Sequence, residues 1–364
     1  MGEMLYQGKV KQVWSTDDPD ILEFRFTNQI SVFDQIIPSL IPRKGESLNR
    51  TTAHWFKLIE EEEICGTHLV ESVRKRVSKS LRKQLILPKN SIKSMGRPFR
   101  VLIAISGGKD SAILLYFLHS ILGSRRDVEL IAGVVDEGID GYRAPSIDCA
   151  EKLCSMMGVK FERISYPDLT FPEMDNVVES LPKISETNLE AKGMMPCSFC
   201  GVFRRQGLNS LAKRIGADVM ALGHNLDDVA QSVLMNLQKG EVDRTARLAP
   251  HTTVPIEGLA PRIVPLRWIP EQEIHAAAIH LNLPIHHGDC PHAGGAMRQR
   301  SREIIATIEK DIPGSRHGLV QSMDRIRELA IDSKNISSIQ SCKKCGEPTS
   351  RPICQSCTMK EWFE

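Results

Sequence analysis

The sequence predicts an α/β protein built on a doubly wound parallel sheet, with a small N-terminal α+β lobe and a C-terminal zinc-binding segment. Three observations carry this prediction. Short β-branched strands alternate with helical stretches between residues 99 and 300, and polar clusters follow the strands. Alternating apolar residues near the N-terminus indicate antiparallel strands. Four cysteines near residue 350 form two CxxC pairs.

Composition places the chain among soluble globular proteins. Its 364 residues lead us to expect two or three domains, and 41% hydrophobic with 25% charged residues argue against a disordered or fibrous chain. No apolar run approaches the roughly 20 residues that span a bilayer, and the first residues lack the apolar centre of a secretory signal. We therefore expect a cytoplasmic protein with no membrane partner.

Charge is distributed unevenly although the net charge is only +2. Residues 1–71 carry seven basic and twelve acidic side chains, whereas residues 72–100 carry ten basic side chains and no acid. A block of like charges repels itself unless a polyanion neutralises it, so nucleic acid is the natural partner. A solvated helix face is the alternative. The candidate contacts are Arg74, Lys75, Arg76, Lys79, Arg82 and Lys83.

The strongest catalytic signal is a strand, a glycine-rich turn and a helix. The predicted strand covers Arg100–Ile105, and an apolar helical run follows the turn. Such a turn presents free backbone N–H groups to an anion at the helix N-terminus, which indicates a phosphate-binding loop. It matches neither the Walker A pattern nor the GxGxxG fingerprint. The turn consists of Ser106, Gly107, Gly108, Lys109, Asp110 and Ser111.

Three more strands are predicted, at 128–135, 158–164 and 217–222. Parallel strands end at one edge of the sheet, where ligands bind, so polar residues that follow the strands are expected near the glycine-rich turn. Any one aspartate there is more typical of a helix N-cap, but three polar clusters at one edge favour catalysis. The candidates are Asp136, Gly223, Asp227 and Asp228.

Three cysteines in the middle of the chain form an odd set. Cys197 and Cys200 make a CxxC pair, and Cys290 follows ninety residues later. An odd number of thiolates suits a metal or cluster with one open coordination position. Three interpretations stay open: a [4Fe-4S] cluster, a redox pair that carries persulfide, and a zinc site completed by a histidine. That histidine would be His286, His287 or His292.

The second cysteine group predicts one structural zinc ion. Its two CxxC pairs are eight residues apart, which allows four thiolates to surround one tetrahedral ion. The segment has almost no apolar residues, so metal binding would have to supply its folding free energy. Two disulfides are the alternative, and they fit poorly with a chain that shows no secretory signal. The ligands would be Cys342, Cys345, Cys354 and Cys357.

The order of these motifs resembles a known family. SGGKDS is similar to the signature of the PP-loop ATP pyrophosphatases, which transfer AMP from ATP to a substrate oxygen. With DEGIDGYR, PCSFCGVFRR, GHNLDDVAQSVLMN and DCPHA, it resembles the TtuA-type tRNA 2-thiouridine synthetases and their wobble-uridine relatives from about residue 70 onward. The resemblance implies an adenine nucleotide alpha hydrolase-like fold. It also implies a basic helix and linker at 72–98, a PP-loop domain at 99–300, a helical extension at 301–338 and a zinc ribbon at 339–364.

The resemblance implies that ATP is bound by the loop Ser106–Ser111. Lys109 would neutralise charge on the leaving pyrophosphate, which is the main lever in adenylyl transfer. Asp110 joins Lys109 among the catalytic candidates. Asp136 and Gly223 would lie near the nucleotide.

Magnesium and a [4Fe-4S] cluster are the other cofactors that the resemblance implies at this site. Asp227 and Asp228 would bind magnesium or orient the target uridine, and capping of the next helix is the alternative. The cluster would leave one iron free for a hydrosulfide that attacks the adenylated carbon. Arg204 and Arg205 would stabilise that anionic sulfur or a tRNA phosphate. The cluster ligands would be Cys197, Cys200 and Cys290.

The N-terminus departs from this family, whose members usually open with a second zinc ribbon, because no cysteine precedes Cys65. Residues 1–71 instead resemble the N-terminal lobe of SAICAR synthetase, a purine-pathway ligase. Alternation predicts strands at Val10–Trp14 and Leu22–Phe26, and a helix is predicted at Leu48–Glu61. Because only this lobe of the ligase is matched, we expect a docking or scaffolding module.

The leading hypothesis is a tRNA sulfurtransferase that performs ATP-dependent 2-thiolation of a uridine. Another PP-loop modification, cytidine thiolation or lysidine synthesis, is the enzyme alternative, and lysidine chemistry needs no cluster. A non-catalytic tRNA-binding or purine-linked regulatory protein is the alternative from another class. Expected partners are tRNA, a sulfur donor (free sulfide or a ubiquitin-like thiocarboxylate carrier) and a second copy in a homodimer. The sequence leaves open which uridine and which donor are used.

Overall fold

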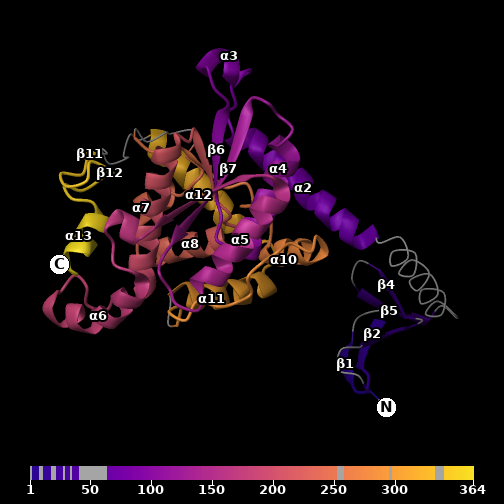
Figure 1. Ribbon diagram of the computed structural model, residues 1–364. Helices are drawn as coiled ribbons and strands as arrows, with labels where there is room; N and C mark the ends of the chain where they lie inside the picture. Colours follow the sequence, from indigo (N-terminus) through magenta and orange to yellow (C-terminus); the bar gives the residue numbers. More distant parts are fainter. Residues whose placement is uncertain are drawn as a thin grey trace. The chain divides into compact units, whose positions relative to one another are not determined.

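The chain divides into two compact units, Met1–Leu69 and Val70–Glu364, in a computed structural model (Figure 1). No helix among the described residues is long and apolar enough to cross a membrane. The helix predicted at Leu48–Glu61 lies outside the described residues. The structure describes residues 2–7, 11–17, 22–27, 29–32, 35–40, 64–251, 258–294, 297–332 and 340–364.

The first unit contains two antiparallel sheets. In the three-stranded sheet β2 is central, and its pairing with β3 places Lys11 opposite Phe26 and Ser15 opposite Leu22. The predicted strand at Leu22–Phe26 is confirmed as β3, and β2 overlaps the strand predicted at Val10–Trp14. The strands are β1 (Met4–Gln7), β2 (Lys11–Ser15), β3 (Leu22–Phe26), β4 (Gln29–Val32) and β5 (Gln35–Leu40), the last two forming the second sheet.

The second unit is built on a five-stranded parallel sheet. Its strand order is β10-β9-β6-β7-β8, which confirms the predicted α/β fold. The central strands are almost continuously apolar because helices cover both of their faces. The strands are β6 (Phe99–Ala104), β7 (Val128–Asp136), β8 (Lys160–Ser165), β9 (Val219–Ala221) and β10 (Arg262–Ile263).

Helices cover the two faces of this sheet in turn. The chain runs from β6 through α4 to β7 and through α5 to β8, then returns by α6 and α7 to β9 on the other side of β6. Because crossovers are right-handed, this reversal places α7 on the face opposite α4 and α5 (Figure 1). Ligands bind doubly wound sheets at such a reversal, here between β6 and β9. The helices are α4 (Lys109–Leu122), α5 (Arg143–Met157), η1 (Pro167–Leu169), α6 (Met174–Thr187) and α7 (Pro196–Ile215).

The later helices pack around this framework. α8 contacts α11 and α12, and α10 contacts α4. The N-terminus of α10 thereby places Glu271 beside Lys109, the first residue of α4, and α11 places Arg302 beside Glu271. The remaining elements are α3 (Ser91–Met95), α8 (Leu226–Gln238), α9 (Val242–Ala246), α10 (Glu271–His280), α11 (Met297–Asp311), α12 (Ser315–Asp332), β11 (Gln340–Ser341), β12 (Pro348–Thr349) and α13 (Gln355–Glu361).

The basic segment forms α2 (Ile64–Gln84), which has one buried face. Val73, Val77 and Leu81 are buried at a spacing of four residues, as expected for one side of a helix. Gln84 fixes the end of the helix, since its side chain donates to the Val264 carbonyl at 3.2 Å and accepts from the Val264 N–H at 2.7 Å. Only the opposite face of α2 is therefore open to a partner.

An aromatic cluster joins the C-terminal segment to α7. Phe171 and Phe203 stack with their ring centroids 4.5 Å apart, and the neighbouring Phe199 is completely buried. Trp362 and Phe363 pack edge-on against Phe199 at centroid distances of 5.9 and 5.7 Å. Phe199 lies between the two cysteines of the CxxC pair, so the C-terminal segment contacts the turn that carries them.

Candidate functional site

The predicted phosphate-binding loop joins β6 to α4 at the strand reversal. Gly107 adopts φ +86°, and a Cβ there would lie 1.9 Å from the Ser146 carbonyl oxygen, so only glycine fits. Ser111 closes the loop: its hydroxyl donates to the Gly108 carbonyl at 2.9 Å and accepts from the Ser106 N–H at 3.1 Å. The first turn of α4 has no side-chain cap, which leaves its N–H groups open to an anion.

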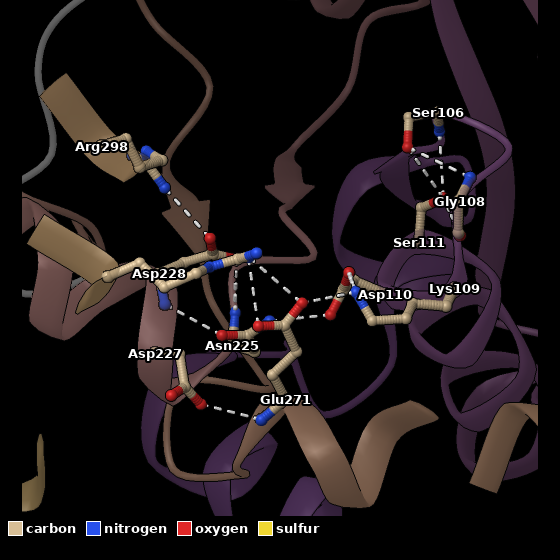
Figure 2. A network of polar contacts seen from close by, with 11 residues as sticks. Ser106, Gly108, Lys109, Asp110, Ser111, Asn225, Asp227, Asp228, Glu271 and Arg298 are labelled. Atoms are coloured by element: carbon tan, nitrogen blue, oxygen red, sulfur yellow. Dashed lines mark hydrogen bonds and ion pairs between the residues drawn. The ribbon is translucent and has the colours of Figure 1, made fainter. Parts of the chain in front are cut away.

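Lys109 lies at the centre of a polar network (Figure 2). Its ammonium nitrogen is 2.7 Å from a Glu271 carboxylate oxygen and 3.1 Å from an Asp110 oxygen. Burial alone would lower the pKa of Lys109, but Asp110 and Glu271 outweigh it and raise the pKa. Burial raises the pKa of Asp110, which also accepts a hydrogen bond of 2.8 Å from the Asn225 amide. The lysine is thus held charged at the start of α4.

The two aspartates of α8 have different partners. Asp228 forms a capping box with Asn225, and its other oxygen accepts from Arg298 at 3.0 Å. Asp227 accepts from the Glu271 N–H and from Arg316, both at 2.8 Å. Asp228 therefore caps the helix, as the alternative interpretation expected, and also lies beside Asp110, whose pKa its charge helps to raise. Asp227 instead ties α8 to α10 and α12.

Sequence reasoning missed the charged residues that complete this network. Arg298 and Arg302 lie one turn apart on α11, and Arg302 donates to both Glu271 oxygens at 3.2 and 3.3 Å. The one available signal was Arg298 in the first turn of α11, where a cation opposes the helix dipole. Glu271 follows Pro270 at the start of a helix, where an acidic residue is common and indicates no functional site. The missed residues are Glu271, Arg298, Arg302 and Arg316.

The two remaining nucleotide candidates lie at neighbouring strand ends. Asp136 ends β7, where its carboxylate accepts from the Gly138 N–H at 3.1 Å and pairs with Arg163. Gly223 follows β9, and a Cβ there would lie 3.4 Å from the backbone of Asp110 and Ser111. The end of β9 therefore approaches the start of α4 closely.

The three middle cysteines gather at the N-terminus of α7. The sulfur of Cys197 is 3.8 Å from the carbonyl oxygen of His292, two residues beyond Cys290. Burial raises the pKa of the Cys197 thiol, and nearby Cys200 and Cys290 add to the effect. Within the described part of the chain, these sulfurs and a histidine do not converge within 4.8 Å as ligands of one ion would.

Cys200 has a polar surrounding that suits an anionic sulfur. Arg204 donates from Nη2 to the Cys200 sulfur at 3.0 Å, and the Tyr166 hydroxyl lies 3.8 Å from the same sulfur. Glu137, 2.6 Å from Arg204 Nε, holds the pKa of that guanidinium above its usual range. Burial raises the pKa of Tyr166, so its hydroxyl keeps its proton as a donor. Arg204 therefore contacts the sulfur of a predicted cluster ligand directly.

Arg205 lies in a separate cationic surrounding. Burial lowers its pKa, and nearby Arg244 adds to the effect. Burial and then Arg205 lower the pKa of Arg262 to about 10. Arg262 donates to the Asn209 side chain at 2.7 Å, one turn beyond Arg205 on α7. Such crowded cations suit a phosphate partner.

The structure separates the six basic candidates of α2 into two groups. Arg76 pairs with Glu273, and Arg74 is 4.0 Å from Glu71 and 3.4 Å from the Ser120 hydroxyl. The other four side chains are exposed on the open face of the helix, although one of them, Lys75, is also 3.7 Å from Glu71. Those four are Lys75, Lys79, Arg82 and Lys83.

The four cysteines near the C-terminus form a closed site. Their sulfurs all lie within 4.8 Å of one another, as four ligands of one tetrahedral ion would. Burial would raise the pKa of Cys342, but N–H groups of Cys345, Cys354 and Lys344 lower it to about 6. The fold therefore stabilises a thiolate there, which is the form that binds zinc.

The strand reversal and the glycine-rich loop that follows β6 define a PP-loop protein, and a group of three cysteines lies at the N-terminus of α7. Residues 77–257 match the family model described as PP-loop domain, and residues 4–92 match that of SAICAR synthetase. The tRNA 2-thiolation protein NcsA of Haloferax volcanii is 33% identical over 310 residues, which cover 83% of this chain and 93% of that protein.

Two further relatives agree with this assignment. Cytoplasmic tRNA 2-thiolation protein 1 of Chlamydomonas reinhardtii is 33% identical over 264 residues, covering 72% of this chain and 71% of that protein. The solved structure of the U34-tRNA thiolase NcsA from Methanococcus maripaludis, with its [4Fe-4S] cluster, superimposes with a TM-score of 0.67 at 32% identity, covering 82% of this chain and 89% of that one. The chain belongs to the NcsA/TtuA family of tRNA 2-thiolation proteins, which confirms the resemblance.

Proposed function

We propose that this protein is an ATP-dependent tRNA-uridine 2-sulfurtransferase. One observation carries the proposal: the loop that holds Lys109 and the group of Cys197, Cys200 and Cys290 lie at the same edge of the sheet. The loop follows β6, and α7 runs from its cysteines back toward β9, so its N-terminus also lies at the carboxyl ends of the strands. Activation by ATP and delivery of sulfur can therefore act on one bound base.

The chain's own residues supply the charge stabilisation for both steps. In the first step, O2 of the uracil forms a bond to the α-phosphorus of ATP and pyrophosphate leaves. Lys109 and the N–H groups of α4 neutralise charge on the phosphates as that bond breaks. In the second step, sulfur attacks C2 of the base and AMP leaves with the former O2. Arg204 donates to the Cys200 sulfur and would stabilise negative charge there, whereas the Tyr166 hydroxyl donates to the Cys200 carbonyl oxygen at 3.1 Å and fixes the turn.

The donor sets suit the cofactors that this chemistry requires. Asp228, together with Asp110 beside the loop, offers carboxylate oxygens for magnesium bound with ATP. Asp227, the other predicted magnesium ligand, accepts instead from the Glu271 N–H and from Arg316. Cys197, Cys200 and Cys290 would hold a [4Fe-4S] cluster, which would supply sulfide for the second step. The terminal cysteines fit a zinc ion with a structural role.

The tRNA contacts follow from the exposed cations. The open face of α2 offers Lys75, Lys79, Arg82 and Lys83, and Arg205 extends this set near the cysteine group. We assign residues 1–71 a docking role, and we further propose a homodimer, a cytoplasmic location and sulfide or a thiocarboxylate carrier as sulfur donor. The five-part domain division stays a prediction.

The test is a reconstituted reaction. Anaerobically purified protein with iron and sulfide restored would be incubated with ATP, magnesium, sulfide and unmodified tRNA, and the nucleosides analysed by mass spectrometry. We expect 2-thiouridine together with AMP and pyrophosphate. Thiocytidine or lysidine instead would assign the chain to another PP-loop modification. ATP cleavage to ADP, or no nucleoside change with a loaded cluster, would refute the proposal.

A further inference from the structure

We propose that Glu137 is a positioning residue that couples the ATP loop to the cysteine group, so that nucleotide and cluster alter each other's affinity. The inference rests on the proposed function in one respect, the assignment of ATP to the loop and of a cluster to the cysteines. The Glu137 side chain is only 3% exposed. One of its oxygens is 2.5 Å from Arg143 Nε, and the other is 2.6 Å from Arg204 Nε.

The two arginines connect Glu137 to both halves of the site. Arg143 Nη1 donates to the carbonyl oxygen of Ser106, the first residue of the loop, at 3.0 Å. Arg204 Nη2 donates to the sulfur of Cys200 at 3.0 Å. A continuous chain of polar interactions therefore leads from the ATP loop to a cluster ligand through a single carboxylate.

The contact between Glu137 Oε2 and Arg143 Nε is an ion pair without hydrogen-bond geometry, and burial strengthens its electrostatic attraction. The Arg143 side chain is 6% exposed, and it also donates to the Val135 carbonyl at 2.5 Å, so water does not screen its attraction to Glu137. A carboxylate shared by two cations responds when either cation moves. When a phosphate binds the loop and moves Ser106, Arg143 moves with the Ser106 carbonyl. Glu137 then transmits this movement to Arg204 and to the Cys200 sulfur.

The coupling has a measurable size and is reciprocal. Linked sites in proteins change each other's affinity by roughly 5- to 150-fold, and by thermodynamic necessity the factor is the same in both directions. We expect the lower part of this range, about 5- to 30-fold. The affinity for nucleotide should differ by that factor between protein with and without its cluster.

The experiment measures nucleotide affinity and needs no tRNA. Calorimetry with α,β-methylene-ATP under anaerobic conditions would compare cluster-loaded protein with protein stripped by a chelator. Glu137→Gln should bring the ratio of the two affinities close to one. Glu129→Gln is the matched control, because Glu129 lies at the other end of β7 and pairs with Arg100 at 2.8 Å, and it should keep the wild-type ratio.

A second variant tests the coupling without disturbing the buried pair, in case Glu137→Gln does not fold. Glu137→Gln weakens the pairing of buried Arg143, whereas Arg204→Gln removes the link to Cys200 and leaves the Glu137–Arg143 pair intact. Both variants should abolish the coupling. A wild-type ratio near one, a ratio preserved in Arg204→Gln, or a ratio abolished in Glu129→Gln would overturn the inference. Intact coupling in a protein that never thiolates tRNA would refute the proposed function instead.

Discussion

The protein contains two groups of cysteines that differ in the number of thiolates and in how closely the sulfurs lie together. The sulfurs of Cys342, Cys345, Cys354 and Cys357 lie within 4.8 Å of one another and fill a tetrahedron. Among the described residues, the group of Cys197, Cys200 and Cys290 has only three members, and their sulfurs do not all lie within that distance of one another. The first arrangement is complete without a substrate, and the second is not.

The polar groups around the sulfurs also differ between the two cysteine groups. Backbone N–H groups surround Cys342, so its partners are fixed by the fold. The Cys200 sulfur instead contacts Arg204, whose side chain is half exposed, and the Tyr166 hydroxyl. The difference teaches that the number of thiolates and the presence of a charged side chain beside the sulfur, more than the CxxC motif, separate a structural site from a reactive one.

The largest expected effect on activity comes from replacing one cysteine of each group by alanine. Cys290→Ala should remove iron and abolish thiolation, because the open site loses a third of its protein ligands. Cys345→Ala should leave the iron in place and reduce thiolation by less than tenfold, with loss of zinc. Metal analysis and single-turnover thiolation would measure both. Equal loss of activity in the two variants with iron retained in both would contradict the comparison.

Lys109→Ala should leave both metal sites loaded and still lower the rate of adenylation by about 100- to 1,000-fold. The reason is that a preorganised cation opposite developing charge typically contributes that factor. Release of pyrophosphate measures the step, and tRNA affinity should stay within a few-fold because Lys109 acts on ATP and α2 on tRNA. Loss of tRNA binding in this variant would show that the two functions are not separate.

Glu271→Gln should lower kcat by at least about tenfold, because a hydrogen bond between charged groups contributes about 1.5–3 kcal/mol and here it holds Lys109. The KM for ATP should not rise, since the carboxylate repels the triphosphate. Glu273→Gln serves as control, two residues along the same helix and paired with Arg76 instead. An unchanged kcat in Glu271→Gln would show that the Lys109–Glu271 ion pair is purely structural.

The smallest effect per residue is expected on the open face of α2. Replacing Lys79, Arg82 and Lys83 by glutamine should weaken tRNA binding and flatten its salt dependence by about 0.7–0.9 log units for each phosphate that the helix no longer neutralises. Arg97→Gln is the control, because Arg97 pairs with Asp218 at 2.7 Å and should affect folding stability but not the salt dependence. An unchanged salt slope in the triple variant would identify α2 as a solvated helix face.

Local patterns predicted most of the framework. The glycine-rich loop, the parallel strands and the terminal cysteine group follow from short stretches of sequence, since strand alternation and metal spacing are local properties. Glu271 could not be found this way, because its partner Lys109 is 162 residues away and the ion pair exists only after α10 packs on α4. The same limit applies to charge: Arg97 belongs to the basic segment, yet Asp218, 121 residues later, neutralises it.

The packing of Trp362 and Phe363 on Phe199 has a consequence for the order of synthesis. About 160 residues separate these partners, and translation at roughly 5 to 20 residues per second takes about 8 to 30 s to cover them. During that interval the Cys197–Cys200 turn has emerged from the ribosome without the aromatic support that holds it in the finished protein. At the zinc site proposed above, metal binding would have to fold the later segment before this support forms. We therefore expect iron to enter last, after the chain has captured zinc.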